Sequence, residues 1–190
     1  MTILATNNSG KAREMREILA AYKIKTLEQA GMEIDVIEDK DTFYGNALKK
    51  ASEIYEIIQE PVIADDSGLC IEALNQWPGV LTHRFLGENR TDRERNEAMI
   101  ERLNNVSDRS AKVVCVLVYY DGKNTIIGNG VIEGSIAHSP RGDNGFGFDE
   151  IFELPNGNTL AELDPLEKNK ISARYLAAQD LKQKLEKIAD

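Results

Sequence analysis

The sequence is poor in the residues that mark disulfide-rich and zinc-binding proteins. Cys70 and Cys115 are its only cysteines, and two widely separated cysteines make neither a disulfide framework nor a zinc knuckle. We expect both to be buried free thiols. The two histidines, His83 and His138, are isolated from each other. We interpret both as structural and exclude a His-based metal site.

Long hydrophobic runs are also missing. The longest apolar stretch, residues 113–120, is far too short to cross a bilayer. Met1 leads directly into Thr2 and the apolar residues 3–5 without a basic segment, so no signal peptide is evident. We therefore predict a cytoplasmic protein that has no membrane partner.

Positive charge is in deficit. The chain has 23 Lys and Arg residues against 32 Asp and Glu residues, a net charge of −9. Nucleic acids and anionic membranes both need a broad basic surface, so we predict that neither is a partner. A phosphate-bearing small molecule is compatible with this charge, because a few lysines, backbone N–H groups and a metal ion are enough to hold it.

The remaining composition is that of a globular protein, with 42% hydrophobic and 29% charged residues. No repeat or low-complexity segment is present. A chain of 190 residues is long enough for one well-packed domain and short for two. Because no linker divides it, we predict a single domain over residues 1–190.

The hydrophobic pattern alternates between strands and helices. Strands are expected at residues 2–5, 34–37, 62–64, 113–120, 125–127 and 131–136. Helices are expected from Lys11, after a cap at Asp41 or Thr42, after a cap at Thr91 or Asp92, from Asp164 and Pro165, and finally through Leu181, Leu185 and Ile188. This order predicts an α/β fold with a mixed sheet.

A polar loop separates the first strand from the first helix. It consists of Thr6, Asn7, Asn8, Ser9, Gly10 and Lys11. The N–H groups and the dipole at a helix N-terminus favour phosphate, and Lys11 adds a positive charge. The loop is not a P-loop, because the first glycine of that motif is missing and Ala12 follows the lysine. It fits either a phosphate site or an ordinary capped helix with a solvated lysine.

Adjacent carboxylates follow the strand predicted at 62–64. Asp65 and Asp66 would repel each other at a strand end unless a cation were present, and Mg²⁺ prefers carboxylate and phosphate oxygens. One aspartate could accept a proton from an attacking water, and Ser67 could donate a hydrogen bond to phosphate. Glu38, in an acidic run, could complete a metal site. The alternatives are an Asp-rich turn and a solvated charged loop.

A glycine-rich loop with two aromatic residues spans residues 141–149. Glycines let the backbone approach a ligand closely, aromatic rings could stack on a base, and Asp149 could accept hydrogen bonds from the base edge. The residues in question are Phe146, Gly147, Phe148 and Asp149. Several cations follow at 167–174. A flexible hairpin tip and a solvated helix face are the alternative interpretations.

No single motif is decisive, but their order along the chain is. The series is TNNSGK, DDSGL, PGV…RF, RGDNGFGFD and AEL…EKNKIS.R. It resembles the inosine/xanthosine triphosphate pyrophosphatase family along nearly the whole chain. The resemblance implies an elongated α/β fold, with a central mixed β-sheet flanked by helices and two lobes with a nucleotide cleft between them, and a homodimer. It also implies Mg²⁺-dependent hydrolysis of ITP, dITP and XTP to the monophosphate and pyrophosphate, a house-cleaning reaction of the nucleotide pool.

The resemblance further implies roles for the matching residues. Asp66 corresponds to the catalytic carboxylate and a metal ligand, with Asp65 and Glu38 as further metal-binding acids. The substrate-binding residues are Thr6, Asn7, Asn8, Ser9, Gly10, Lys11, Ser67, Phe146, Gly147, Phe148, Asp149, Lys168, Ser172 and Arg174. Within this set, residues 6–11 bind the triphosphate and residues 146–149 hold the base.

The chain departs from the family pattern at four places. Ala173 stands where the family usually has a histidine, Glu150 where the aromatic loop usually has a proline, and Gly45 where a glutamate is usual. Thr82 and His83 replace a Ser-Ala pair. These departures bear on substrate range more than on the reaction. Two alternatives follow: a pyrophosphatase with shifted base specificity, and a nucleotide-binding protein without catalysis.

Overall fold

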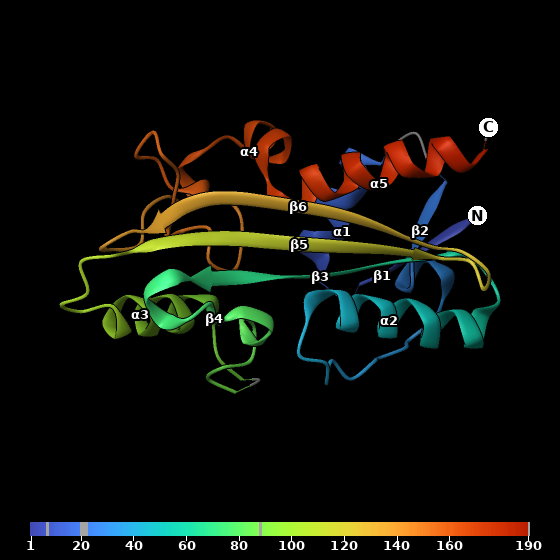
Figure 1. The fold of residues 1–190 in the computed structure, drawn as a ribbon, viewed down its shortest axis with the longest axis horizontal. Helices are drawn as coiled ribbons and strands as arrows, with labels where there is room; N and C mark the ends of the chain where they lie inside the picture. Colours follow the sequence, from blue (N-terminus) through green and yellow to red (C-terminus); the bar gives the residue numbers. More distant parts are fainter. Residues whose placement is uncertain (7, 20–22, 88, 190) are drawn as a thin grey trace. The chain divides into compact units, whose positions relative to one another are not determined.

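The computed structural model describes residues 1–6, 8–19, 23–87 and 89–189, apart from the side chains of Ser9, Ile188 and Ala189 (Figure 1). Asn7, a predicted member of the triphosphate loop, lies outside the described residues. Within these ranges, no helix combines the length and the apolar character needed to cross a membrane.

Seven strands of the described chain form one sheet. They are β1 (Thr2–Ala5), β2 (Ile24–Thr26), β3 (Val62–Ile71), β4 (Trp77–Pro78), β5 (Ser110–Tyr120), β6 (Thr125–Ile136) and β7 (Phe152–Glu153). Their order is β2-β1-β3-β5-β6-β7, and β4 pairs with β3. β1 runs parallel to β2 and β3, whereas the pairs β3–β4 and β6–β7 are antiparallel. The predicted mixed sheet is therefore confirmed.

The described residues also form five α-helices and four short 3₁₀ helices. The α-helices are α1 (Ser9–Ile18), α2 (Phe43–Ile58), α3 (Asp92–Arg102), α4 (Pro165–Ile171) and α5 (Ala173–Ala189). The 3₁₀ helices are η1 (Glu28–Ala30), η2 (Glu72–Leu74), η3 (Gly79–Leu81) and η4 (Leu160–Glu162). The α/β class predicted from the sequence is confirmed.

Polar caps fix the starts of three helices. Asn8 Oδ1 accepts the Lys11 N–H at 3.0 Å before α1, and the Thr42 side chain accepts a backbone N–H of α2 at 3.0 Å. At α3, Thr91 and Glu94 each accept the other's backbone N–H, which makes a capping box. These bonds satisfy N–H groups that have no partner inside a helix. The cap at Asn8 also places Lys11 in the first turn of α1.

The chain divides into two compact units. Unit 1 comprises Met1–Ser67, Cys115–Gly130 and Ser172–Asp190, and unit 2 comprises Gly68–Val114 and Val131–Ile171. Strands β3, β5 and β6 have residues in both units. The single-domain boundary 1–190 stays a prediction.

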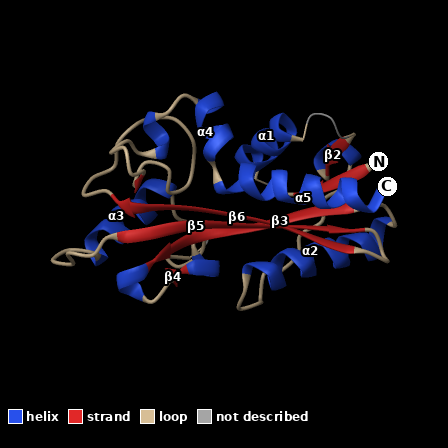
Figure 2. Ribbon diagram, turned by 45° about the horizontal axis from the view of Figure 1, so that its top comes forward, coloured by secondary structure: helices blue, strands red, loops and turns tan. Residues whose placement is uncertain are grey.

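Helices cover both faces of the strands in unit 1. α1 and α5 lie on one face and α2 lies on the other (Figures 1 and 2). Two glycines of β6 let α5 approach closely, because a side-chain carbon at Gly130 or Gly128 would collide with the main-chain oxygens of Ala173 and Ala177. Since Arg174 follows Ala173, this close packing holds Arg174 near the sheet.

Three sequence-based strand assignments need correction. β3 does not end before Asp65 but continues to Ile71, and all its residues are buried, as expected for a strand with helices on both faces. The strand predicted at 34–37 is wrong: that segment has no regular structure, and β2 pairs with β1 instead. The strands predicted at 125–127 and 131–136 form one continuous β6, because the intervening glycines face α5 and still pair in the sheet.

The glycine-rich loop lies wholly within unit 2. Gly142, Gly145 and Gly147 have φ angles of 82°, 84° and 65°, a region that favours glycine. The Asn144 N–H donates to the main-chain oxygen of Ala161 at 3.0 Å, and the Asn144 side chain donates to the main chain at 163. These bonds argue against a flexible hairpin tip.

Candidate functional site

β3 separates the two adjacent aspartates. Side chains alternate between the two faces of a strand, so Asp65 shares a face with Ser67 while Asp66 points to the other. Asp65 contacts residues of α1 and α5, and Asp66 contacts a residue of α2. The two carboxylates thus have separate surroundings, whereas the sequence suggested mutual repulsion at a strand end.

Cations surround Asp65. Lys11 Nζ lies 3.0 Å from Asp65 Oδ2, and Arg174 Nη2 lies 3.4 Å from the same oxygen. Arg174 Nη2 also donates to Ser67 Oγ at 3.2 Å, and Arg174 Nη1 forms an ion pair with Glu14 of α1. All five side chains are buried. Buried charges need such partners, because taking an unpaired ion out of water is very costly.

This network sets the ionisation of Asp65. Burial alone raises the pKa of a carboxyl, but the positive charges of Lys11, Arg174 and Lys50 outweigh burial and hold the pKa of Asp65 well below its ordinary value. Burial lowers the pKa of Arg174, but the charge of Asp65 above all raises it overall. Asp65 is therefore ionised at neutral pH and keeps Lys11 and Arg174 in place.

Asp66 has no such surplus of cations. Its Oδ2 accepts the Asn46 side-chain amide at 2.9 Å, and its Oδ1 accepts the Ser67 N–H at 2.9 Å. Burial and then the negative charge of Glu38 raise the pKa of Asp66 to about 6, although Lys50 and Asn46 act in the opposite direction. A carboxyl with this pKa changes its charge close to neutral pH.

Lys50 contacts both Glu38 and the main chain of β3. Its Nζ donates to Glu38 Oε1 at 2.5 Å and to the main-chain oxygen of Asp65. Burial lowers the pKa of Lys50, but the charges of Asp65, Glu38 and Asp66 raise it overall. Lys50 is therefore a fixed cation beside Asp66.

The acids offer two candidate metal ligands. No three His, Cys, Asp or Glu side chains gather as a ready-made metal site in the described part of the chain. Asp66 and Glu38 are the acids whose negative charges act on each other, while Asp65 Oδ2 faces Lys11 and Arg174. Mg²⁺ usually keeps several waters and takes one or two carboxylates plus substrate phosphates. Two carboxylates of this kind fit a Mg²⁺ ion.

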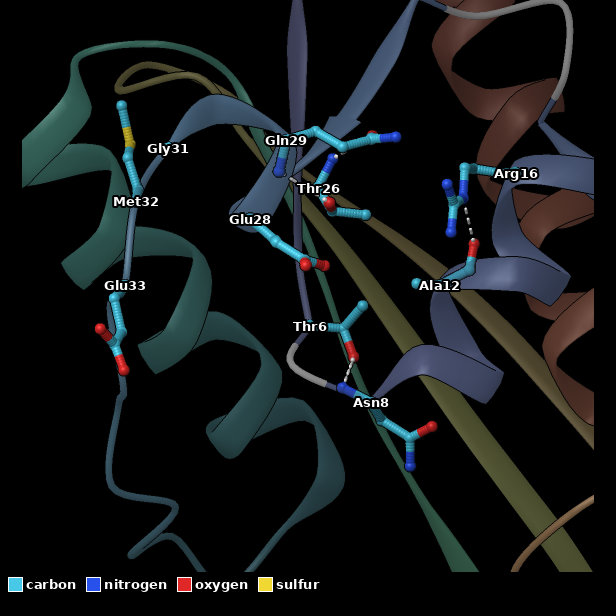
Figure 3. Close-up of a pocket in the computed structure, with 10 residues that line it drawn as sticks. All are labelled: Thr6, Asn8, Ala12, Arg16, Thr26, Glu28, Gln29, Gly31, Met32 and Glu33. Carbon is cyan, nitrogen blue, oxygen red and sulfur yellow. Dashed lines mark hydrogen bonds between the residues drawn. The ribbon is translucent and has the colours of Figure 1, made fainter.

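A cavity of about 690 Å³ opens beside the predicted triphosphate loop. Its lining residues are Thr6, Asn8, Ala12, Arg16, Thr26, Glu28, Gln29, Gly31, Met32 and Glu33 (Figure 3). Thr6 Oγ1 accepts the Asn8 N–H at 3.2 Å and shapes the loop. The carboxyl ends of the parallel strands β1 and β2 meet at this edge. The loop and the first turn of α1 therefore border open space large enough for a ligand.

In unit 2 the aromatic loop is built around Asp149. Asp149 is only 4% exposed, and its Oδ2 accepts the Phe146 N–H at 2.8 Å and Lys168 Nζ at 2.6 Å. Lys168 Nζ also lies 4.6 Å from the centre of the Phe146 ring. A side-chain carbon at Gly145 would collide with Asp149. Residues predicted from two separate motifs thus meet in one cluster.

The structure places the predicted site residues in two groups. Unit 1 contains Thr6, Asn8, Ser9, Gly10, Lys11, Glu38, Asp65, Asp66, Ser67, Ser172 and Arg174, and unit 2 contains Phe146, Gly147, Phe148, Asp149 and Lys168. Ser172 Oγ accepts the Tyr175 N–H at 3.1 Å, so it caps the first turn of α5. Gly10 lies in the first turn of α1.

Sequence reasoning missed Glu14 and the role of Asn46. Glu14 lies three residues after Lys11, a spacing that puts both on one face of α1, but its partner Arg174 is 160 residues away. Asn46 is fully buried next to Ala47. A polar residue inside the apolar stripe of a helix was the available signal.

Comparisons with known proteins extend over both units. Residues 2–184 match the sequence model of the Ham1 family. A dITP/XTP pyrophosphatase from Clostridium tetani is 40% identical over 190 residues, which cover 96% of this chain and 94% of the relative. A dITP/XTP pyrophosphatase from Coxiella burnetii is 45% identical over 186 residues, 94% and 93% of the two chains. The solved structure of a HAM1 protein from Coxiella burnetii has a TM-score of 0.89 at 42% identity and covers 98% of both chains.

Proposed function

Because the chain belongs to the Ham1 family, we propose that it hydrolyses the non-standard purine nucleotides ITP, dITP and XTP to the monophosphate and pyrophosphate. The names of the relatives from Clostridium tetani and Coxiella burnetii support this activity. The observation that carries the proposal is the buried Asp66 carboxyl, which Asn46 and Ser67 hold in place and whose pKa is raised to about 6. Shifted carboxyls of this kind are typical of catalytic sites.

The triphosphate is assigned to unit 1. Lys11 and the backbone N–H groups at the start of α1 supply positive charge and donors for phosphate oxygens. Thr6 and Asn8 line the adjoining cavity. Asn7, Ser9, Gly10 and Ser67 stay predicted members of this site. Because Lys11 Nζ is anchored on Asp65, its ammonium group is already in place when the substrate arrives.

Mg²⁺ is the proposed cofactor, with Asp66 and Glu38 as its protein ligands. The charge of Glu38 raises the pKa of Asp66 although Lys50 pairs with Glu38. This motivates the assignment, since a divalent cation would relieve the repulsion that remains. When bound, the ion supplies charge stabilisation to phosphate oxygens. Asp65, predicted as a further ligand, has its Oδ2 against Lys11 and Arg174. We therefore assign Asp65 to holding these cations.

The chemistry is the transfer of a nucleotidyl group to water. A water oxygen bonds to phosphorus, the α–β anhydride bond opens, and pyrophosphate leaves. The ionised Asp66 orients the water and accepts its proton. Lys11 and the loop N–H groups hold the negative charge of the leaving pyrophosphate.

Base recognition is assigned to the cluster in unit 2. Phe146 and Phe148 offer aromatic surfaces, and Lys168 is a donor suited to the C6 oxo group of hypoxanthine and xanthine. Adenine carries an amino group at C6, which cannot accept a hydrogen bond from Lys168. Adenine would therefore leave this donor unpaired and bind more weakly. Arg174 and Ser172 stay predicted substrate-binding residues. Ala173 stands where the family usually has a histidine, so this chain lacks one candidate contact with the base.

The test is a product assay across nucleotides. The protein is incubated with Mg²⁺ and, separately, ITP, dITP, XTP, ATP, GTP, UTP and dTTP, and both pyrophosphate and single phosphate are quantified. We expect pyrophosphate release to be strongest with ITP, dITP or XTP. A preference for another base would keep the reaction and reassign the substrate. Tight binding without release would favour a nucleotide-binding protein that lacks catalysis.

We also propose that the chain works as a homodimer in the cytoplasm, without nucleic-acid or membrane partners. The family resemblance supports the dimer, and the net charge of −9 supports the lack of polyanionic partners. Light scattering coupled to size-exclusion chromatography tests the dimer directly.

A further inference from the structure

Both main-chain groups of Gly147 are held by one helix. The Gly147 N–H donates to Asp92 Oδ2 at 2.7 Å, and the Gly147 oxygen accepts Asn96 Nδ2 at 2.9 Å. Asp92 and Asn96, which we call the α3 clamp, lie 55 and 51 residues before Gly147. All of these residues belong to unit 2.

Burial, an ion pair and a helix cap hold the two side chains of the α3 clamp. Asn96 is 1% exposed, whereas half of the other α3 residues are exposed. A buried amide is costly unless it is hydrogen-bonded. Arg95 Nη1 lies 3.4 Å from Asp92 Oδ1, the carboxylate oxygen that Gly147 does not use. The capping box at Thr91 fixes the first turn from which Asp92 projects. These contacts hold both members of the α3 clamp, of which Asn96 is buried and Asp92 is half exposed.

Gly147 lies between the two aromatic residues proposed to face the base. Its φ of 65° is a conformation that residues with side chains rarely adopt. One residue earlier, the Phe146 N–H donates to Asp149 Oδ2. The Phe146 oxygen accepts the Asp149 N–H at 3.3 Å. The main chain is thus held at all four polar atoms from the Phe146 nitrogen to the Gly147 oxygen. Fixing these atoms also fixes the directions in which the Phe146 and Phe148 rings leave the main chain.

We propose that Asp92 and Asn96 are positioning residues for base recognition, acting through Gly147. The inference rests on the proposed function, in which Phe146 and Phe148 face the base. A loop held in its binding conformation pays less ordering entropy when the ligand arrives. Loss of the clamp therefore weakens nucleotide binding. It leaves the chemical step unchanged, because Asp66 and Lys11 belong to unit 1.

The experiment uses two disruptive variants, one conservative variant and one control. Asn96→Asp keeps the size of the side chain but faces the Gly147 oxygen with an acceptor. Asp92→Ala removes the acceptor of the Gly147 N–H, whereas Asp92→Asn retains an oxygen that can accept it. Asn104→Asp is the matched control, because it makes the same chemical change as Asn96→Asp on an exposed side chain two residues after α3 ends.

We expect Asn96→Asp and Asp92→Ala to raise KM for ITP about tenfold, equivalent to about 1.4 kcal/mol, with kcat within about twofold of wild type. The preference for ITP over ATP in kcat/KM should fall in parallel, because the proposed Lys168 contact distinguishes a C6 oxo group from an amino group. Asp92→Asn should recover most of the loss, and Asn104→Asp should match wild type. Hydrogen exchange should report faster exchange of the Gly147 amide in Asp92→Ala.

Unchanged KM and selectivity in a folded Asp92→Ala or Asn96→Asp protein overturn the inference. A fall in kcat at constant KM does so as well, because it would indicate a role in the chemical step. If one variant does not fold, the other decides. If wild type releases no pyrophosphate from any nucleotide, the proposed function fails. The dissociation constant for ITP then carries the test: a tenfold rise in the variants supports the clamp, and no rise overturns it.

Discussion

The two faces of β3 in unit 1 shift the pKa values of neighbouring aspartates in opposite directions. Asp65 meets Lys11 and Arg174, and its pKa is held well below the ordinary value. Asp66 meets an amide and a backbone N–H, and burial and Glu38 raise its pKa to about 6. A one-residue step along a strand is enough to change the surroundings completely, because it reverses the face.

The difference separates a structural task from a chemical one. A carboxylate that stays ionised can hold cations in place, and one that titrates near neutral pH can exchange a proton or bind a metal ion. Pairs of titratable groups whose surroundings push their pKa values apart commonly divide acid–base roles in this way. The sharpest tests of the site therefore compare the two faces.

The largest effect is expected from Asp66→Asn. Asparagine keeps the shape and one acceptor oxygen but removes the charge that we propose to orient water and bind a cation. We expect kcat for ITP to fall by roughly 10³-fold, as for the loss of a general base or an electrostatic contact in the transition state. Initial rates of pyrophosphate release at saturating ITP and Mg²⁺ measure it. Near-normal turnover would contradict the assignment of Asp66.

Asp65→Asn is the matched control, since it makes the same change on the other face. We expect it to lower stability because Lys11 and Arg174 lose the carboxylate that they share, although Arg174 keeps its ion pair with Glu14. It should affect kcat far less than Asp66→Asn does. Asp66→Asn, in contrast, should raise the free energy of unfolding of the metal-free protein. The folded pKa of Asp66 is raised, so the ionised form opposes folding above about pH 6 and its removal stabilises the fold there. Denaturant unfolding with a chelator at pH 8 checks both signs.

The second-largest effect is expected from Lys11→Met, which should lower the free energy of unfolding. This variant removes one of the cations that compensate the buried Asp65, and breaking a buried ion pair costs about 3 kcal/mol. The depressed pKa of Asp65 stabilises the fold above its ordinary value near 4, and that contribution is lost as pH falls through the lower folded pKa. The difference in unfolding free energy between wild type and variant should therefore shrink below about pH 4.

Lys182→Met serves as the control for Lys11→Met. Lys182 makes an exposed ion pair with Glu186 on α5, and such pairs contribute about 0.5 kcal/mol or less. Equal losses in the two variants would mean that the network around Asp65 contributes nothing beyond an ordinary surface pair.

The sequence predicted the members of this comparison but not their arrangement. Asp65, Asp66, Lys11 and Arg174 all stood in recognisable motifs. Each of the caps at Thr42 and Thr91 could be narrowed to two neighbouring residues, because capping needs particular side chains at fixed spacing. The strand was expected to end before Asp65, since charged residues are uncommon inside buried strands. Only long-range contacts with α1 and α5 make the buried position possible.

Other features had weak local signals. The alternating pattern at 34–37 resembles a strand, yet the three residues of β2 take the place beside β1. Such a short strand is specified by its pairing and not by its own sequence. Glu14 and Asn46 are polar residues on amphipathic helices, and only tertiary contacts show that they are buried. The contacts of Asp92 and Asn96 with Gly147 span more than 50 residues.

The third effect is on the pH dependence of turnover. If the ionised form of Asp66 is the active one, kcat/KM should rise about tenfold per pH unit below about pH 6 and level off above it. Saturating Mg²⁺ should move this midpoint downward, because a bound cation favours the charged carboxylate. A profile that stays flat from pH 5 to 8 at limiting Mg²⁺ would argue that another group controls the reaction.

The smallest effect is expected from Asn46→Ala, and it tests how finely the Asp66 face is tuned. The Asn46 amide donates to Asp66 Oδ2 at 2.9 Å and lowers the pKa of Asp66 against the opposing effect of burial. Its loss should raise that pKa by up to about one unit, since a hydrogen bond to a charged group contributes about 1.5 kcal/mol and one unit corresponds to about 1.4 kcal/mol. The carboxyl-carbon chemical shift of Asp66, followed by NMR against pH in metal-free protein, measures this change in pKa.

The midpoint of the kcat/KM profile should move in the same direction by a similar amount. A downward shift, or a shift in activity without one in the NMR titration, would show that Asn46 acts on turnover by some route other than the charge of Asp66.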